Sequence, residues 1–192
     1  CFGNSASIGG TATGGANSYT YSWSPSAGLS ATNVAIVTAT PSVTTTYTET
    51  VTDGCGTVTT DQVVVTVNQL PTVTANATST AVCTGNSVTL SGGGATSYSW
   101  SGGVMDGVSF VPTATATYMV TGTDANSCSN TATITVTVNP LPTVTANATS
   151  TSICDGSSVT LTGGGATSYT WDNSVTDGVS FVPTATTTYM VI

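Results

Sequence analysis

Residues 83–100 read Cys-Thr-Gly-Asn-Ser-Val-Thr-Leu-Ser-Gly-Gly-Gly-Ala-Thr-Ser-Tyr-Ser-Trp, and this stretch decides the fold that the sequence predicts. Small apolar residues alternate with hydroxyl residues, and glycines interrupt the alternation at 92–94. A period of two that is broken by turn residues is typical of short β-strands. The stretch therefore predicts strands near 87–91 and 97–100, with a turn at the three glycines.

The same pattern returns 71 positions later, at 154–171, where it again begins with Cys and ends with Trp. A shorter match lies at the N-terminus, where Cys-Phe-Gly-Asn-Ser at 1–5 aligns with Cys-Thr-Gly-Asn-Ser at 83–87. A period of this size is one small domain in series, which favours a stalk or fibre over a catalyst. The predicted units are 1–69 without its first strand, 70–139 complete, and 140–192 without its C-terminal strand.

The complete unit carries strand signals throughout and shows no helical pattern. In its last strand Ile134, Val136 and Val138 alternate with threonines, so one face is buried and the other presents a row of threonines. A single sheet cannot bury such a face alone, so the unit is predicted to be two sheets packed face to face. The predicted strands are 72–77, 87–91, 97–100, 107–111, 116–122 and 130–139.

Aromatic and branched apolar residues are predicted to fill the space between the two sheets. In the complete unit the predicted core is Val88, Leu90, Tyr98, Trp100, Val108, Phe110, Tyr118, Val120, Ile134 and Val136. The recurrent aromatic residues interpreted as core are Trp23, Trp100, Trp171, Tyr47, Tyr118 and Tyr189. These three tyrosines each precede an alternating strand, a placement that suits a tyrosine corner.

The composition excludes several classes of function. The chain has no Lys, Arg or His, and charged residues make up 4% of it, against about 25% in ordinary soluble domains. Nucleic acids and anionic membranes are bound through cations, so neither is an expected partner. Catalysis loses its commonest acid-base groups and amine nucleophiles, so no enzyme and no cofactor are expected. No apolar run is long enough to insert into a membrane.

The eight carboxylates are mostly found in contexts typical of turns. Asp106, Asp155 and Asp177 each precede a glycine, which supplies the positive φ that tight turns need. The alternative is a calcium site, with Asp106 and Asp177 as the recurrent candidates, although no Asp-x-Asp-x-Asp cluster occurs. A hydrolase that uses only carboxylates would need paired acids at a cleft, and this is the least favoured interpretation.

The five cysteines predict a disulfide framework. The simplest pairing joins Cys1 to Cys55 and Cys83 to Cys128, and the partner of Cys154 then lies outside the chain. Each bridge would pin one end of a sandwich and contribute about 2–4 kcal/mol. Persistent disulfides indicate an oxidising compartment outside the cytoplasm. Lipid modification of Cys1 is the alternative, which its alignment with Cys83 and Cys154 disfavours.

The motif Cys-x-Gly-x-Ser-Val-Thr-Leu-x-Gly-Gly-Gly-Ala-Thr-Ser-Tyr-x-Trp, followed by Thr-x-Thr-Tyr and Val-Thr-Val-Asn-Pro-Leu-Pro, resembles a known class of repeat. It is similar to the immunoglobulin-like and PKD-like repeats of very long cell-surface proteins in Bacteroidetes. The first unit shares the resemblance at 21–25 and 45–47. The resemblance implies tandem immunoglobulin-like sandwiches, export by the type IX system, and a role in adhesion, gliding or extracellular filaments. It implies no catalytic residues.

These observations favour a non-enzymatic extracellular protein that forms a bacterial surface filament or an adhesin stalk. Strand edges without lysine favour self-association or contact with neighbouring repeats. Glycans are a second way to cover an uncharged surface, and Asn76 and Asn147 open matching acceptor sequons. The competing interpretation is an adhesive immunoglobulin-like module that binds surface polysaccharide or, through its rows of threonines, ice. Its aromatic candidates are Tyr19, Tyr21, Tyr98 and Tyr169.

Overall fold

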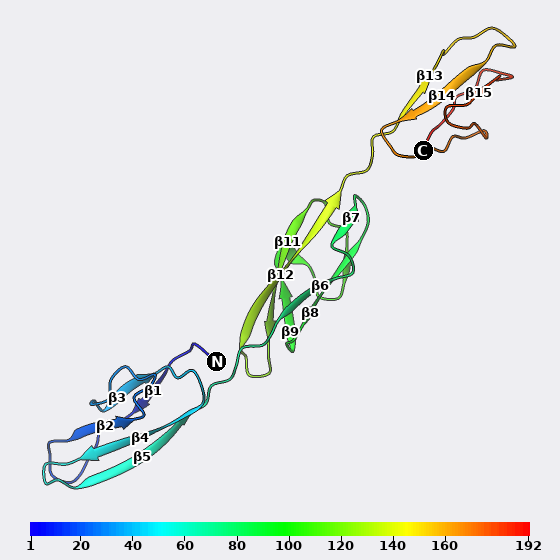
Figure 1. Cartoon of the computed structure of the whole chain (residues 1–192). Helices are drawn as coiled ribbons and strands as arrows, with labels where there is room; N and C mark the ends of the chain where they lie inside the picture. Colours follow the sequence, from blue (N-terminus) through cyan, green and yellow to red (C-terminus); the bar gives the residue numbers. More distant parts are fainter. The chain divides into compact units, whose positions relative to one another are not determined.

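The computed structural model describes all residues from 1 to 192 as short β-strands joined by turns and loops (Figure 1). The prediction of an all-β chain is confirmed, since the only helical element is a three-residue 3-10 turn, η1, at Ser101–Gly103. No helix is long and apolar enough to cross a membrane. The chain separates into two compact units, 1–138 and 139–192.

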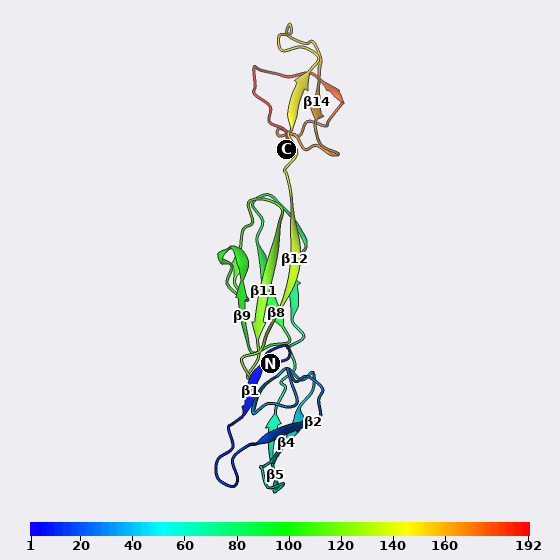
Figure 2. The same ribbon diagram turned by 90° about the vertical axis from the view of Figure 1, so that its left-hand side faces the viewer.

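The middle segment, residues 70–139, folds into two sheets (Figures 1 and 2). One sheet has the order β10-β8-β6 and the other has the order β7-β12-β11-β9. In the immunoglobulin fold strands A, B and E share one sheet and C, F and G share the other, and this order matches. The strands are β6 (Thr74–Ala77), β7 (Ala81–Cys83), β8 (Val88–Gly93), β9 (Ser97–Trp100), β10 (Ser109–Phe110), β11 (Ala116–Thr123) and β12 (Ser129–Asn139).

The core of this segment takes side chains from both sheets. Leu90 on β8, Val120 on β11 and Val136 on β12 are fully buried at its centre, with Trp100 beside them. Val108 is an exception, because its side chain is 48% exposed and the prediction that it belongs to the core is wrong. It lies in the turn before β10, where its amide donates to the Met105 carbonyl and its side chain faces solvent.

The end of β8 and the presence of β7 differ from the prediction for physical reasons. Strand β8 runs on through the glycines that the sequence favoured as a turn, because Thr74 and Ala75 pair with Gly93 and Gly92. The ring of Tyr98 lies so close to Gly92 that an added Cβ would be 2.2 Å from it. Strand β7 was not predicted, since three residues are too few for a periodic signal.

The first segment, residues 1–69, also places strands in two sheets. Strands β1 (Ala6–Gly9) and β3 (Ile36–Ala39) form a pair, and the other sheet has the order β2-β4-β5. The latter strands are β2 (Thr20–Ser24), β4 (Thr45–Thr52) and β5 (Val58–Val65). The buried core residues are Ile8, Trp23, Val37, Ala39 and Tyr47.

The last segment, residues 140–192, has one regular sheet. Its strands are β13 (Thr145–Ala148), β14 (Val159–Gly164) and β15 (Ser180–Phe181), with β14 in the centre. The register of β13 on β14 is that of β6 on β8 with every residue number raised by 71. Opposite this sheet, pairing is reduced to a bridge between Trp171 and Val191. The buried core consists of Val159, Leu161 and Trp171.

Candidate functional site

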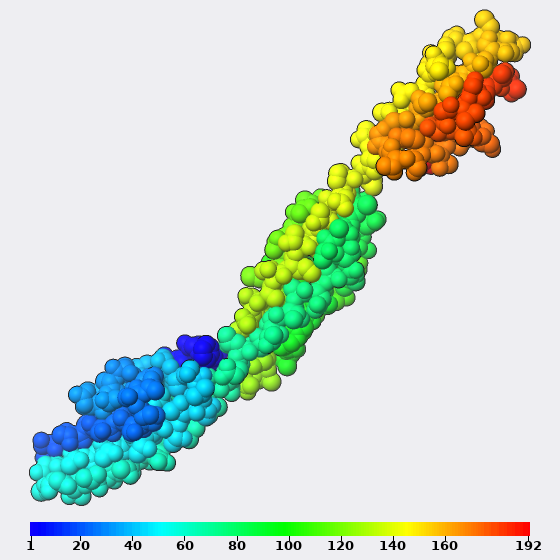
Figure 3. Space-filling model, viewed as in Figure 1, coloured from blue at the N-terminus to red at the C-terminus, as the bar shows by residue number.

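One disulfide joins the first segment to the middle segment. Cys1 is bonded to Cys128, with 5.4 Å between their Cα atoms. Figure 3 shows the N-terminal residues, in dark blue, against the beginning of the middle segment. The predicted pairs Cys1–Cys55 and Cys83–Cys128 are therefore wrong. The bond connects two segments of the chain instead of closing a loop within one.

In the middle segment, the length of β12 explains why Cys83 and Cys128 are not bonded to each other. Cys128 directly precedes β12, whereas Cys83 is the last residue of β7. The Thr137 amide donates to the Thr80 carbonyl, so β7 lies beside the far end of β12. The nine steps along the chain from residue 128 to residue 137 span about 30 Å in a strand. A disulfide needs Cα atoms about 4.4–6.8 Å apart. Cys83 and Cys128 thus lie at opposite ends of one sandwich.

The first segment has the same arrangement. Cys55 precedes β5, whereas the Phe2 amide, next to Cys1, donates to the carbonyl of Asn68 beyond the end of β5 at 2.8 Å. We call the end at which the last strand begins the proximal end, and the opposite one the distal end. Cys1 lies at the distal end of the first segment and Cys128 at the proximal end of the next, so they can meet at the junction.

Local hydrogen bonds fix the two bonded cysteines. Cys1 begins a turn that the Asn4 amide closes on the Cys1 carbonyl at 3.0 Å. Cys128 is almost fully buried, and its loop is held by Asp124, whose Oδ1 accepts the amides of Asn126 and Cys128 at 2.9 and 2.8 Å. The junction is held further by Asn130, whose Nδ2 donates to the Pro71 carbonyl at 3.1 Å.

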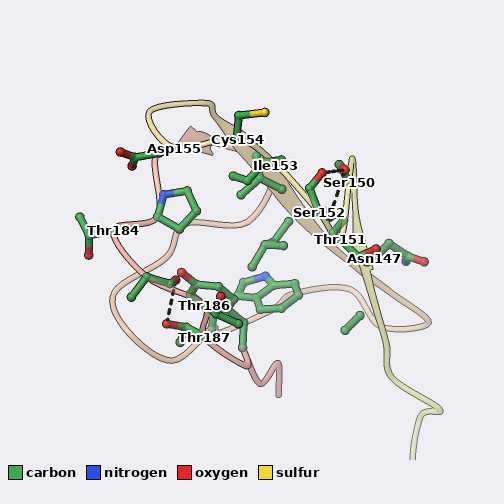
Figure 4. Close-up of a pocket in the computed structure, with 18 residues that line it drawn as sticks. Asn147, Ser150, Thr151, Ser152, Ile153, Cys154, Asp155, Thr184, Thr186 and Thr187 are labelled. Atoms are coloured by element: carbon green, nitrogen blue, oxygen red, sulfur yellow. Dashed lines mark hydrogen bonds between the residues drawn. The ribbon is translucent and has the colours of Figure 1, made fainter.

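The other three cysteines, Cys55, Cys83 and Cys154, are free and exposed. In Figure 4 the sulfur of Cys154 points away from the neighbouring groove. None of the three is paired within the chain, so the predicted framework of intradomain bridges is not formed.

A groove opens in the last segment, with a volume of about 520 Å³. It runs along β13 and β14 and is closed on its far side by residues 183–189 (Figure 4). Leu161 and Trp171 line its floor. In the middle segment their counterparts Leu90 and Trp100 pack in one cluster with Val136 of β12. The groove therefore lies where the middle segment has its last strand.

The two calcium candidates hold tryptophans. Oδ1 of Asp106 accepts the indole N–H of Trp100 at 2.8 Å and the Gly92 amide at 2.7 Å. Asp177 does the same for Trp171 and the Gly163 amide at 2.8 and 2.7 Å. No group of three or more His, Cys, Asp or Glu side chains comes together. Each of these two carboxylates thus accepts two N–H hydrogen bonds within its own segment.

The first segment contains a carboxylate pair that the sequence analysis did not single out. Glu49 on β4 pairs across the sheet with Asp61 on β5, beside Trp23, in a hollow of about 390 Å³. Burial, and then the charge of Asp61, raise the pKa of Glu49 above its usual 4.5. Oε1 of Glu49 is buried without a hydrogen-bond partner. The sequence signal that could have found this pair is Glu49, an acid in the middle of an alternating strand.

Asp53 has the opposite shift. Its side chain accepts amide hydrogens from Thr57, Ala16 and Cys55, at 2.8, 3.2 and 2.9 Å. These bonds favour the charged carboxylate, the one from Thr57 most of all, and they lower the pKa of Asp53 below its usual 3.8. The group fixes the loop that carries Cys55.

The aromatic residues mostly serve packing. Trp23, Trp100 and Trp171 are buried, and so is Tyr47, whose hydroxyl donates to the Ala27 carbonyl at 2.7 Å. That carbonyl is 20 residues upstream, so Tyr47 does not make the short local contact of a tyrosine corner. Tyr118 and Tyr189 are half-buried and lie edge-on to Phe110 and Phe181, with ring centroids 5.4 Å apart in each pair.

The candidate ligand-stacking tyrosines are also engaged within the chain. The hydroxyl of Tyr98 donates to the carbonyl of Ala95 and accepts its amide, and Tyr169 does the same with Ala166. Tyr21 accepts the Ala12 amide, and Tyr19 donates to the Gly14 carbonyl. These contacts give each tyrosine a structural role in its own turn.

The two sequon asparagines lie on exposed strands. Asn76 is on β6 at the edge of its sheet, and its Nδ2 donates to the Ser91 carbonyl at 3.3 Å. Asn147 is at the matching place on β13, where its Nδ2 donates to the Thr162 carbonyl at 3.4 Å. Both side chains are reachable from solvent.

Comparison with known proteins shows similarity to solved structures only. No protein-family model and no curated protein matches the chain. Among solved structures the chain is similar to an amphioxus IgVJ-C2 molecule, with 15% identity over 71% of this chain and 97% of that one, and a TM-score of 0.31. Nothing in these comparisons supports the expected membership of the Bacteroidetes repeats. The immunoglobulin-like fold follows from the strand order of the middle segment.

Proposed function

We propose that this chain is a non-enzymatic structural protein of the bacterial cell surface, in which serial immunoglobulin-like units, 1–69, 70–139 and 140–192, form a filament or an adhesin stalk. The observation that carries the proposal is the Cys1–Cys128 bond. A covalent bond between successive segments has a clear use in a protein that carries tension along its length.

The bond changes how the chain responds to tension. A force applied to the two ends passes from Cys1 to Cys128 through the sulfur atoms, and residues 2–127 are shielded from it. The first segment then stays folded until the bond is reduced, whereas β12 of the middle segment, which begins at Ser129, remains in the path of the force. Such shielding is of little use to a dispersed binding module.

The surface also supports self-association. Val58 and Val64 are exposed on β5, which is the edge strand of its sheet, and Asp61 is the only charged residue on that strand. Edge strands of monomeric proteins usually carry lysine or other charges that prevent pairing. This edge has almost none, which favours a neighbouring copy as the partner. The disulfide also favours an oxidising, extracellular location.

Glycans are the second means of covering this surface. The exposed Asn76 and Asn147 are the proposed attachment sites, and export by the type IX system remains part of the proposal through the resemblance described above. No metal or other cofactor is proposed.

Electron microscopy of native, unreduced surface material, with an antibody raised against the chain, tests the function. Labelled regular filaments or stalks that project from the cell are expected. Label confined to the cytoplasm would contradict the location, and dispersed chains that bind a polysaccharide panel would favour the binding module instead.

Single-molecule stretching tests the mechanical role directly. With the bond intact, only the part beyond Cys128 can extend, and reduction is expected to add about 400 Å of contour length, since an extended chain spans at most about 3.6 Å per residue. The Cys1→Ser variant should give the long extension without reductant. Equal lengths before and after reduction would contradict the shielding role.

A further inference from the structure

Strand β5 has a free edge in the first segment. It pairs with β4 on one side only, and Figure 1 shows it at the border of its sheet. The Asp53 amide donates to the Thr57 carbonyl in the turn that joins the two strands. Because hydrogen-bonded and non-hydrogen-bonded pairs alternate in an antiparallel ladder, the pair of Glu49 and Asp61 is hydrogen-bonded. The free backbone N–H and C=O groups, which point away from β4, are therefore those of residues 58, 60, 62 and 64.

The residues along this edge are self-complementary about Asp61. If β5 pairs antiparallel with β5 of a second copy so that the two Asp61 residues are opposite each other, Val58 of each copy faces Val64 of the other. Both valines are exposed in the single chain. The outward backbone groups of 58 and 60 then meet those of 64 and 62. A register centred on Gln62 would place Val64 opposite Thr60 and leave Val58 without a partner in β5.

The register about Asp61 places four carboxylates in one row across the joined sheets. Glu49 is opposite Asp61 within each copy. The two Asp61 residues form a non-hydrogen-bonded pair, in which Cα atoms are about 4.5 Å apart. Like charges that are directly opposite each other are destabilising. The chain has no Lys, Arg or His, so no side chain of either copy can neutralise the row.

In the single chain the Asp61 carboxylate also occupies the edge. Its Oδ1 accepts the Gln62 amide at 2.8 Å, and that amide is one of the outward N–H groups that a second strand needs. A charged carboxylate is a stronger acceptor than a neutral carboxyl, so protonation of Asp61 weakens this contact. A charge on an edge strand is a common means of preventing contact with another chain.

Glu49 and Asp61 are the titratable groups around the hollow beside β5. Oε1 of Glu49 is buried without a hydrogen-bond partner, so no donor stabilises a negative charge on that atom. On the same face of the sheet, the hydroxyls of Tyr21 and Tyr47 are hydrogen-bonded to backbone groups. Asp53 is held by the amides of its own loop. A proton taken up in the hollow therefore goes to the pair of Glu49 and Asp61.

We propose that two copies of this chain pair through their β5 strands about Asp61, and that the pair takes up protons on its carboxylate row, so that acidification favours pairing. The occupant of the edge is a second copy because a two-fold axis at Asp61 satisfies the outward backbone groups and covers both exposed valines at once. The inference rests on the self-association in the proposed function and adds its strand, its register and its control by pH.

Sedimentation equilibrium of the full chain, with its three exposed thiols alkylated, tests the pairing between pH 7 and 4.5. A monomer is expected at pH 7 and a dimer at acidic pH. Uptake of two protons per pair would raise the association constant by at most about a hundredfold for each unit of falling pH. A monomer at every pH would overturn the inference, as would a dimer that forms at pH 7 with calcium and is unaffected by acid.

Hydrogen exchange locates the contact at one fixed acidic pH, in dilute and in concentrated solution. The amides of 58, 60, 62 and 64 should gain protection in the concentrated solution only. A gain confined to other strands would overturn the assignment of the edge.

Variants of β5 separate the backbone contact from the charge. Thr60→Pro removes one outward N–H and keeps the bonds to β4, because proline is tolerated on an edge strand with its nitrogen toward solvent. It should abolish pairing, and Thr60→Ser, which keeps the N–H, is the control. Val64→Thr leaves the backbone intact and should weaken pairing about tenfold, since two valine contacts are lost.

Asp61→Asn removes the charge, keeps the Oδ1 acceptor and should permit pairing at pH 7 with little dependence on pH. Pairing that survives Thr60→Pro, or that keeps its full pH dependence in Asp61→Asn, would overturn the inference. Native filaments built from a chain that does not pair through β5 would overturn it and leave the proposed function standing. Acid-dependent pairs of a protein that forms no filament or stalk would do the reverse.

Discussion

The middle and last segments differ in structure although their sequences are closely matched at a spacing of 71. Val82 is buried on β7, which lies against β12, whereas its counterpart Ile153 is 37% exposed and lies in no strand. Strand β12 covers one side of the middle core, and the last segment has a groove in the same place. The sheet of β13, β14 and β15 and the contact between Asp177 and Trp171 thus form without a counterpart of β12. A counterpart of β7 is not formed in the last segment.

The largest expected effect is a loss of stability in the middle segment, but not in the last segment, when the disulfide is broken. Reduction of Cys1–Cys128, or Cys1→Ser, is expected to lower the free energy of unfolding of the middle segment by about 4 kcal/mol, because the bond closes a very long loop. The last segment has no such bond and should be unaffected. Segment-resolved hydrogen exchange measures both, with the exposed Cys83→Ser as the control. Equal loss in both segments would contradict the comparison.

A peptide with the sequence of β12 should make the last segment resemble the middle one. A synthetic peptide of residues 129–139 is expected to bind the groove and protect the amides of 152–154 and 187–192, which match β7 and β11, the neighbours of β12 in its sheet. At a hundredfold excess over its dissociation constant it would stabilise the segment by about 2.7 kcal/mol.

The control peptide carries threonine at the positions of Ile134, Val136 and Val138, which removes its apolar face. Binding is measured by calorimetry and by hydrogen exchange of the full chain. Equal binding of the two peptides would show that the groove does not select the buried face of β12.

The hydrogen bonds from the Trp100 and Trp171 indoles to Asp106 and Asp177 should contribute equally to stability in the two segments. Asp106→Ala and Asp177→Ala are each expected to cost about 2 kcal/mol, since both leave an indole N–H and a glycine amide without their acceptor. Asp106→Asn keeps the Oδ1 acceptor and is the control. Chemical denaturation followed by tryptophan fluorescence measures the change. A much smaller cost in the last segment would show that its anchor also depends on the last strand.

A polar substitution at one matched position should have unequal effects. Val82→Thr buries a hydroxyl and is expected to cost about 1–2 kcal/mol. Ile153→Thr changes a side chain that is 37% exposed and should cost less than Val82→Thr. Thermal unfolding of the two variants measures the difference. Equal costs would imply that Ile153 is covered in solution.

The smallest expected effect concerns the first segment, where Glu49 matches Val120 of the middle segment. Glu49 lies 71 positions before Val120 and replaces a buried apolar residue with an acid. Because its pKa is raised in the folded chain, the folded state takes up a proton before the unfolded state does as pH falls. The free energy of unfolding therefore gains a favourable contribution as pH is lowered toward 4.5, and this contribution is lost as pH rises through the raised pKa.

Glu49→Val should be more stable than the unsubstituted chain at pH 7 and should lack this gain on acidification. Denaturation between pH 7 and 4.5 measures it. Asp53 acts in a separate window, since its lowered pKa removes stability only as pH falls below 3.8. A gain that persists in Glu49→Val would show that another group is responsible.

The sequence predicted those features that depend on local pattern. Alternation was sufficient for β9, β11, β12 and the beginning of β8, and the burial of Trp100 and Leu90 followed from their strands. The disulfide could not be paired by spacing alone, because Cys83 and Cys128 belong to the same repeat but lie at opposite ends of an 11-residue strand. The length of that strand, combined with the alignment of Cys1 and Cys83, was the signal that could have found the bond.

Other misses have tertiary causes. The role of Gly92 depends on the ring of Tyr98 that covers it, and β7 depends on β12 as its neighbour. Asp106 was interpreted as a turn residue or a calcium ligand because its contacts with the Trp100 indole and the Gly92 amide depend on how the loop after β9 folds back. These features require the packed structure.

The Cys1–Cys128 bond also bears on damage to the backbone. If a protease cuts any single peptide bond between these two residues, both fragments remain attached through sulfur. Two-thirds of the printed sequence thus tolerates a nick without the loss of covalent continuity from the first residue to the last.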